Sequence, residues 1–176
     1  MSIDFTLCEA ILKEHSKAQR DIIVQWIGTD QKRFNQLLQL FLKDEYRVTQ
    51  RASWALSYCI EAHPIFIKNK LGLLIDNLQK PGLHDAIKRN TIRILQHINI
   101  PEKHQGKVMD ICFNYVQSPT EAVAIKAFSL TVLGNLAKLY PEILGEIKLV
   151  IEEQSPHETA AFKSRAKRLL KEVGLS

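Results

Sequence analysis

The chain has 176 residues, of which 45% are hydrophobic, so it can bury a core of its own and is not expected to be intrinsically disordered. Its net charge of +5 is concentrated at the carboxy terminus, because residues 159–176 hold five cations and one anion. This distribution argues against a basic nucleic-acid-binding surface that extends over the whole protein. No apolar run approaches the roughly 18 residues of a membrane span, and the start Met1-Ser2-Ile3-Asp4 does not resemble a signal peptide, so we expect a soluble cytoplasmic protein.

The amino-terminal part of the chain predicts three helices, over residues 5–13, 17–27 and 31–42. Ser16 is the expected N-cap of the second helix and Gly28 its end, while Thr29 or Asp30 can cap the third. The third helix carries an apolar stripe that we expect to be buried, made of Phe34, Leu37, Leu38, Phe41 and Leu42.

The six prolines occupy two positions of a repeating frame. Pro81, Pro119 and Pro156 are 38 and 37 residues apart, and Pro64, Pro101 and Pro141 are 37 and 40 apart. Proline suits the first turn of a helix, where its missing N–H needs no partner, so each proline is interpreted as a helix start. Two starts in each period of about 37 residues predict stacked helical pairs.

The periodicity between the prolines supports these pairs and gives about ten helices in all. After Pro64, an apolar face is formed by Ile67, Leu71, Leu74 and Leu78. After Pro101, the buried face is expected at Val108, Ile111, Cys112 and Tyr115, and the opposite polar face at Lys103, Lys107, Asp110, Asn114 and Gln117. Residues 122–139 are apolar nearly all round, so that helix must pack on several sides. By the same period Asp44 takes the place of Pro81, and residues 47–62 become the first helix of a pair.

Two segments at equivalent positions resemble HEAT and armadillo repeats. They are Asp44-Glu45-Tyr46-Arg47-Val48 with the later Ala52 and Ala55-Leu56, and Ser118-Pro119-Thr120-Glu121-Ala122-Val123 with the later Ala127. The resemblance covers roughly residues 30–176 and implies an all-α, right-handed α-α superhelix whose second helices line a concave surface that holds another macromolecule. It implies no reaction. We expect one domain over residues 1–176, with N-terminal helices and a first pair in 1–43, repeats at 44–80, 81–118 and 119–155, and a capping helix in 156–176.

A row of cations recurs at the repeat period, at Arg51, Lys88, Lys126 and Lys163. Such a ladder could follow a phosphate backbone or an acidic peptide. The alternative, which we favour, is a structural role in which carboxylates such as Asp85, Glu121 and Glu158 pair with these cations, since the ladder lies on first helices, the expected convex side.

The second helices predict a surface of mixed charge. The preferred partner-binding residues are Lys68, Lys70, Lys103, Lys107, Asp110 and Asn114. The next second helix carries four carboxylates, Glu142, Glu146, Glu152 and Glu153. Because carboxylates repel phosphate, a protein partner fits this surface better than nucleic acid does.

The last predicted helix has one apolar and one basic side. The apolar side consists of Phe162, Ala166, Leu169, Leu170 and Val173. The basic side consists of Lys163, Arg165, Lys167, Arg168 and Lys171. It is interpreted as a cap that keeps the array soluble, and alternatively as a surface for an acidic protein or RNA.

Motifs for catalysis or metal binding are not found in the sequence. The six histidines show no HxxxH or HExxH spacing, and only one His-Glu dipeptide, His157-Glu158, occurs. Cys8, Cys59 and Cys112 are interpreted as reduced thiols that mostly fill the core, and Trp26 and Trp54 are expected to be buried. The motif residues of HEAT-like DNA glycosylases that remove alkylated purines cannot be placed on this chain.

The sequence therefore predicts a non-catalytic protein-binding or scaffolding module without a cofactor, as a monomer or weak dimer that does not bind membranes. The alternative is a nucleic-acid-binding protein that uses the basic carboxy-terminal helix, and a glycosylase is the third possibility.

Overall fold

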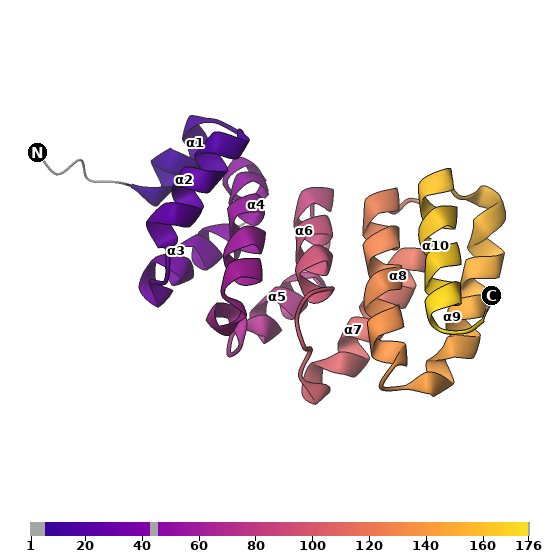
Figure 1. Ribbon diagram of the computed structural model, residues 1–176. Helices are drawn as coiled ribbons and strands as arrows, with labels where there is room; N and C mark the ends of the chain where they lie inside the picture. The colour runs from indigo at the N-terminus through magenta and orange to yellow at the C-terminus, as the bar shows by residue number, and fades with distance from the viewer. Residues whose placement is uncertain (1–5, 43–45, 176) are drawn as a thin grey trace, which may run out of the picture. The chain divides into compact units, whose positions relative to one another are not determined.

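The computed structural model describes residues 6–42 and 46–175, and within these ranges every regular element is helical (Figure 1). The elements are α1 (Leu7–Lys13), α2 (Lys17–Ile27), α3 (Gln31–Leu42), α4 (Tyr46–Ala62), η1 (Pro64–Ile67), α5 (Leu71–Asn77), α6 (Asp85–Leu95), α7 (Glu102–Gln117), α8 (Val123–Ala137), η2 (Pro141–Ile143), α9 (Leu144–Gln154), η3 (Ser155–His157) and α10 (Ala160–Glu172). The all-α class and the predicted number of helices are confirmed for the described part of the chain.

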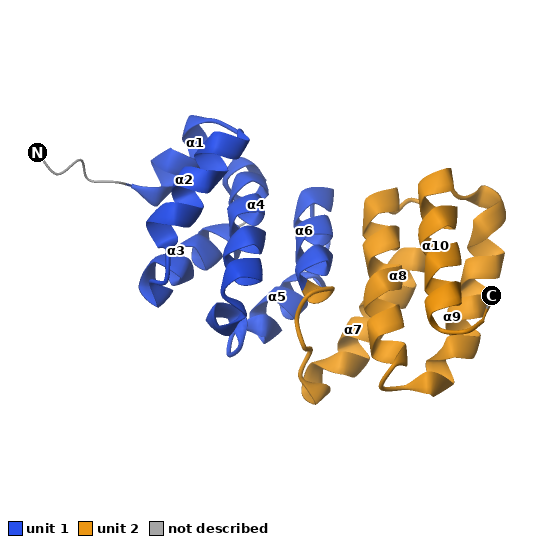
Figure 2. Cartoon of the chain, viewed as in Figure 1, with its two compact units in different colours: residues 1–94 blue, residues 95–176 orange. Residues whose placement is uncertain are grey.

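The chain divides into two compact units, residues 1–94 and 95–176 (Figure 2). Each unit is described by itself below. The predicted single domain and its repeat boundaries stay predictions.

The caps of the amino-terminal helices explain why α2 and α3 begin where the sequence predicts. The Gln19 amide donates to Ser16 Oγ over 3.1 Å, and the Lys32 and Arg33 amides donate to Asp30 Oδ1 over 2.7 and 3.2 Å. The hydrogen bond from the Arg33 amide, followed by that from Lys32, lowers the pKa of Asp30. Gly28 has a positive φ of 50°, which suits glycine at a helix end. Asp30, rather than Thr29, is therefore the cap of α3.

The prolines do not all begin α-helices, and this part of the prediction is wrong. Pro64, Pro141 and Pro156 lie in the first turns of the short 3₁₀ helices η1, η2 and η3. Pro101 is the N-cap of α7, while Pro81 and Pro119 lie in turns four residues before α6 and α8 begin. A fixed φ near −65° serves a turn or a 3₁₀ helix as well as an α-helix, so the regularly spaced prolines do not all mark the start of an α-helix. Phe5, Asp44 and Glu45 lie outside the described residues.

The core of the amino-terminal unit follows the predicted stripes. Phe34, Leu37, Leu38 and Phe41 are buried in α3, whereas Leu42 is half-buried. Ile67, Leu71, Leu74 and Leu78 are all buried, and the Phe34 ring stacks on the Phe66 ring with 4.8 Å between centroids. Burial of these apolar side chains holds α3, η1 and α5 together.

The carboxy-terminal unit is built around α8. Its side chains are buried on several sides, at Ile125, Leu130, Val132, Leu133 and Leu136, as the apolar pattern predicts. On α7, Val108, Ile111 and Cys112 are buried and Tyr115 is half-buried, while the predicted polar face is exposed. α8 packs against both α7 and α10, so it is the central helix of this unit.

Polar contacts from side chains join residues that lie about one repeat apart in the sequence. In the first unit the Asn90 amide donates to Ser53 Oγ over 2.7 Å. In the second, the Tyr140 hydroxyl donates to Gln105 Oε1 over 2.6 Å. Because such contacts recur at 32–39 residues, they fix neighbouring helical pairs in register.

Candidate functional site

The basic ladder is not a row of exposed cations. The Arg51 guanidinium donates to the Leu12 carbonyl over 2.7 Å, and Lys126, only 1% exposed, donates to the Glu158 carboxylate. Lys88 Nζ lies 3.9 Å from Asp85 Oδ1, and of the four ladder residues Lys163 alone is exposed. Three of the four cations therefore serve contacts within their own unit. Lys88 and Lys126 contact carboxylates, as the structural interpretation expects, whereas Arg51 donates to a main-chain carbonyl instead.

The residues expected to bind a partner fall in both units. Lys68 is exposed at the end of η1, and Lys70 Nζ donates to Asn35 Oδ1 over 2.8 Å in the same unit. The other four are exposed on one side of α7, at Lys103, Lys107, Asp110 and Asn114. We call these four residues the α7 face. They are the part of the predicted partner-binding surface that lies on a single helix.

The tryptophans are not core residues, and this prediction is wrong. Trp26 and Trp54 are half-buried, and the Arg33 guanidinium lies 4.7 Å from the Trp26 ring centroid. The buried Arg20 guanidinium lies 4.8 Å from the Trp54 centroid and 3.8 Å from that of Tyr58. Cation–π contact explains why these rings stay near the surface, since each covers the flat face of an arginine.

The last helix is amphipathic as expected. Phe162, Ala166 and Leu169 are buried against the unit, while Leu170 and Val173 are half-buried. Lys163, Lys167 and Lys171 are exposed at successive i, i+4 positions and therefore form one stripe, which we call the lysine stripe. Thr159 caps the helix, since its hydroxyl accepts a hydrogen bond from the Phe162 amide at 3.4 Å.

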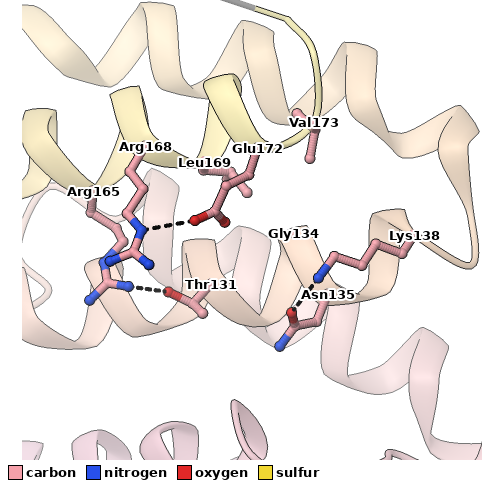
Figure 3. Close-up of a pocket in the computed structure, with 9 residues that line it drawn as sticks. All are labelled: Thr131, Gly134, Asn135, Lys138, Arg165, Arg168, Leu169, Glu172 and Val173. Atoms are coloured by element: carbon pink, nitrogen blue, oxygen red, sulfur yellow. Dashed lines mark hydrogen bonds and ion pairs between the residues drawn. The ribbon is translucent and has the colours of Figure 1, made fainter.

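The two arginines of α10 lie over a pocket between α8 and α10 (Figure 3). Arg165 Nη1 donates to Thr131 Oγ1 over 3.2 Å, and Arg168 Nε donates to Glu172 Oε1 over 2.8 Å. Lys138, the C-cap residue of α8, donates from its Nζ to Asn135 Oδ1 over 3.4 Å. We call this the α8–α10 pocket, and its polar lining consists of Thr131, Asn135, Lys138, Arg165, Arg168 and Glu172.

The floor of the α8–α10 pocket is tightly packed. A Cβ added at Gly134 would meet Leu169 Cδ1 at 2.2 Å, so the absence of a side chain there lets α10 approach α8 closely. The α8 contribution to the pocket was missed by the sequence analysis. The sequence spacing could have indicated it. Thr131 lies 34 residues before Arg165, Asn135 lies 34 before Leu169, and Lys138 lies 34 before Glu172.

The cysteines differ in accessibility, which gives a first prediction. Burial raises the pKa of Cys59 and of Cys112 to about 12, whereas Cys8 is half-exposed. Since the thiolate is the reactive form, we expect an aromatic disulfide reagent at pH 8 to label Cys8 alone in the native protein, and all three cysteines in denaturant. Rapid labelling of Cys59 or Cys112 in the native state, read by mass spectrometry, would contradict the burial of these thiols.

Two further properties bear on the kind of site. No group of three or more potential metal ligands occurs among the described residues. None of the helices in the described ranges combines the length and the apolar character that a membrane span requires.

Comparison with known proteins identifies the family. Residues 7–173 match the HEAT repeat domain family. No curated protein and no solved structure gives a match to this chain. Since the family match covers nearly the whole chain, the chain belongs to the HEAT repeat domain family.

Proposed function

We propose that this HEAT repeat chain is a non-catalytic, cytoplasmic module that binds or scaffolds another protein through the α7 face. The observation that carries the proposal is the side-chain distribution on α7. Lys103, Lys107, Asp110 and Asn114 are all exposed on the side opposite to the buried Val108 and Cys112. Both signs of charge and an amide on one face suit a protein partner, which also presents both signs.

The rigidity of α7 supports this role. Gln105 is buried, and its Nε2 donates to the Ile100 carbonyl over 2.8 Å while its Oε1 accepts from the Tyr140 hydroxyl over 2.6 Å. These bonds fix the start of α7 relative to the following helical pair. A face that is already ordered binds without a large loss of conformational entropy. Lys68 and Lys70 stay in the proposal as a separate contact surface in the amino-terminal unit.

A pull-down with matched variants tests the proposal. The tagged full chain is incubated with lysate of its native cell after nuclease treatment, as wild type and as Lys103→Glu/Lys107→Glu. The expected result is a protein that the wild type retains and this variant loses. The control is Lys13→Glu/Lys17→Glu, which changes the same charge at the same four-residue spacing on exposed positions of the other unit.

Retention of that protein by the control variant is part of the expected result. Equal retention by all three proteins would contradict the assignment to the α7 face. Loss of every bound protein after nuclease treatment would contradict protein binding itself.

A nucleic-acid function remains the second candidate because of the lysine stripe. Lys163, Lys167 and Lys171 are exposed and have no ion-pair partner among the described residues. If they contact duplex phosphates, the logarithm of affinity must fall with the logarithm of salt concentration by about 0.9 for each phosphate neutralised. Absence of DNA and RNA binding at about 50 mM salt would exclude this function.

A further inference from the structure

The α8–α10 pocket concentrates donors that the fold does not use. A guanidinium has five N–H donors and an ammonium three. Within the described structure Arg165 contacts Thr131, Arg168 contacts Glu172 and Lys138 contacts Asn135, through one nitrogen each. The remaining donors are available to an acceptor that enters from solvent.

One carboxylate already occupies the edge of this pocket. Figure 3 shows Glu172 directed from α10 toward the space above α8, where Arg168 donates to it. This hydrogen bond, and then the charges of Arg168, Lys138 and Arg165, lower the pKa of Glu172. Three cations therefore favour negative charge at this position, and Glu172 neutralises only one of them.

We propose that the α8–α10 pocket binds an acidic segment of a protein partner, whose carboxylates accept hydrogen bonds from Arg165, Arg168 and Lys138. The inference concerns a different surface from the α7 face, but it rests on the proposed function in taking the partner to be a protein. Arginine presents its donors as a planar fork that matches a carboxylate, which makes two arginines a suitable pair for this ligand.

The charges of the same unit favour a short acidic segment over a nucleic acid. Exposed carboxylates lie on the next helical elements, with Glu142 in η2 and Glu146, Glu152 and Glu153 on α9. A continuous phosphate backbone that extended from the pocket over these elements would meet repulsion from their carboxylates. A short peptide can place its carboxylates on the three cations alone.

The pocket walls are held in position by packing. Leu169 of α10 packs closely against Gly134 of α8, and the buried Phe162 anchors the start of α10. The bond between Arg165 and Thr131 joins the two helices across the pocket. The cations are therefore presented by fixed helices, which limits the ordering that binding requires.

Fluorescence anisotropy with a labelled peptide tests the proposal on the full chain. The probe alternates glutamate and serine over twelve residues, and the comparison probe has glutamine in place of glutamate. We expect the glutamate peptide to bind and the glutamine peptide not to bind. Arg165→Gln should lower the affinity about three- to fivefold, and Glu172→Gln should raise it by about the same factor, because the pocket then gains net positive charge.

A matched variant separates the pocket from general attraction to a basic helix. Lys163→Gln removes the same charge from the same helix, but Lys163 belongs to the lysine stripe and does not line the pocket. It should change the affinity less than about twofold. An equal loss in Lys163→Gln and Arg165→Gln, or no gain in Glu172→Gln, would overturn the proposal.

Two further arms identify the ligand class and the surface. A twelve-nucleotide single-stranded DNA that binds more tightly than the peptide and is weakened by Arg165→Gln would overturn the proposal in favour of nucleic acid. The α7-face variant Lys103→Glu/Lys107→Glu should bind the peptide with an affinity within about twofold of wild type. Peptide binding therefore tests the pocket proposal separately from the α7-face proposal, which the pull-down tests. Circular dichroism before each titration confirms that every variant is folded.

Discussion

Replacing Glu158 with alanine is expected to destabilise the protein by about 3–5 kcal/mol, because it leaves a buried ammonium without its carboxylate. Lys126 is 1% exposed and lies on α8, the central helix of its unit, where its Nζ donates to Glu158. A charge that cannot reach water and has lost its partner raises the free energy of the folded state alone. Urea denaturation followed by circular dichroism measures the change.

Two variants test this explanation of the Glu158 effect. In Lys126→Met/Glu158→Gln the ammonium is removed together with the carboxylate, so most of the lost stability should return. Glu152→Ala removes one partner of the exposed Lys148–Glu152 pair, whose side chains are 48% and 60% exposed, and should cost less than about 1 kcal/mol. If Glu158→Ala cost no more than Glu152→Ala, Lys126 would not be buried as the structure places it.

The helices that the sequence predicts most accurately are those with explicit caps. Ser16, Gly28 and Asp30 fix the ends of α2 and the start of α3, and local rules describe their chemistry fully. The buried faces of α3, α5 and α7 also follow from the spacing of their apolar residues, since these residues lie on one side of the helix and that side packs against the core.

The prolines indicated the spacing of the repeats better than they indicated where each helix begins. Pro81 and Pro119 recur in the frame, but they lie in turns four residues before the following helices. The ring fixes one dihedral angle of one residue, and turns, 3₁₀ helices and α-helices all accept that angle. Which of them forms is decided by packing of the residues that follow.

Equal spacing also concealed unequal environments in the basic ladder. Arg51 donates to main-chain carbonyls of α1, Lys126 is buried with Glu158, and Lys163 is exposed. The spacing places them at the same point of each repeat, but it does not say which neighbour is present there.

The tryptophans and the α8–α10 pocket show what a stripe of apolar residues cannot reveal. Trp54 lies in an apolar helical pattern, yet Arg20, from another helix, covers its ring. Similarly, Arg165 forms a pocket with Thr131 only because α10 packs on α8. Both features depend on pairs of helices, so a pattern within one helix gives no sign of them.

Leu74→Ala and Leu73→Ala, two substitutions at adjacent positions of α5, are expected to have very different effects. Leu74 is 0% exposed, whereas Leu73 is 51% exposed. Truncating Leu74 removes apolar contacts and leaves a cavity, at a cost of about 2–5 kcal/mol. Truncating Leu73 should change the free energy of unfolding by less than about 0.5 kcal/mol, since alanine is also the better helix former.

The pair is informative because both substitutions remove the same atoms from the same helix. Any difference between them therefore reports which side of α5 faces the core, and not the helix propensity of leucine. Urea denaturation midpoints and slopes for both variants give this difference directly. A Leu74→Ala effect below about 0.5 kcal/mol would mean that α5 is turned away from its assigned face. The register of the predicted repeat 44–80, which contains α4 and α5, would then be wrong as well.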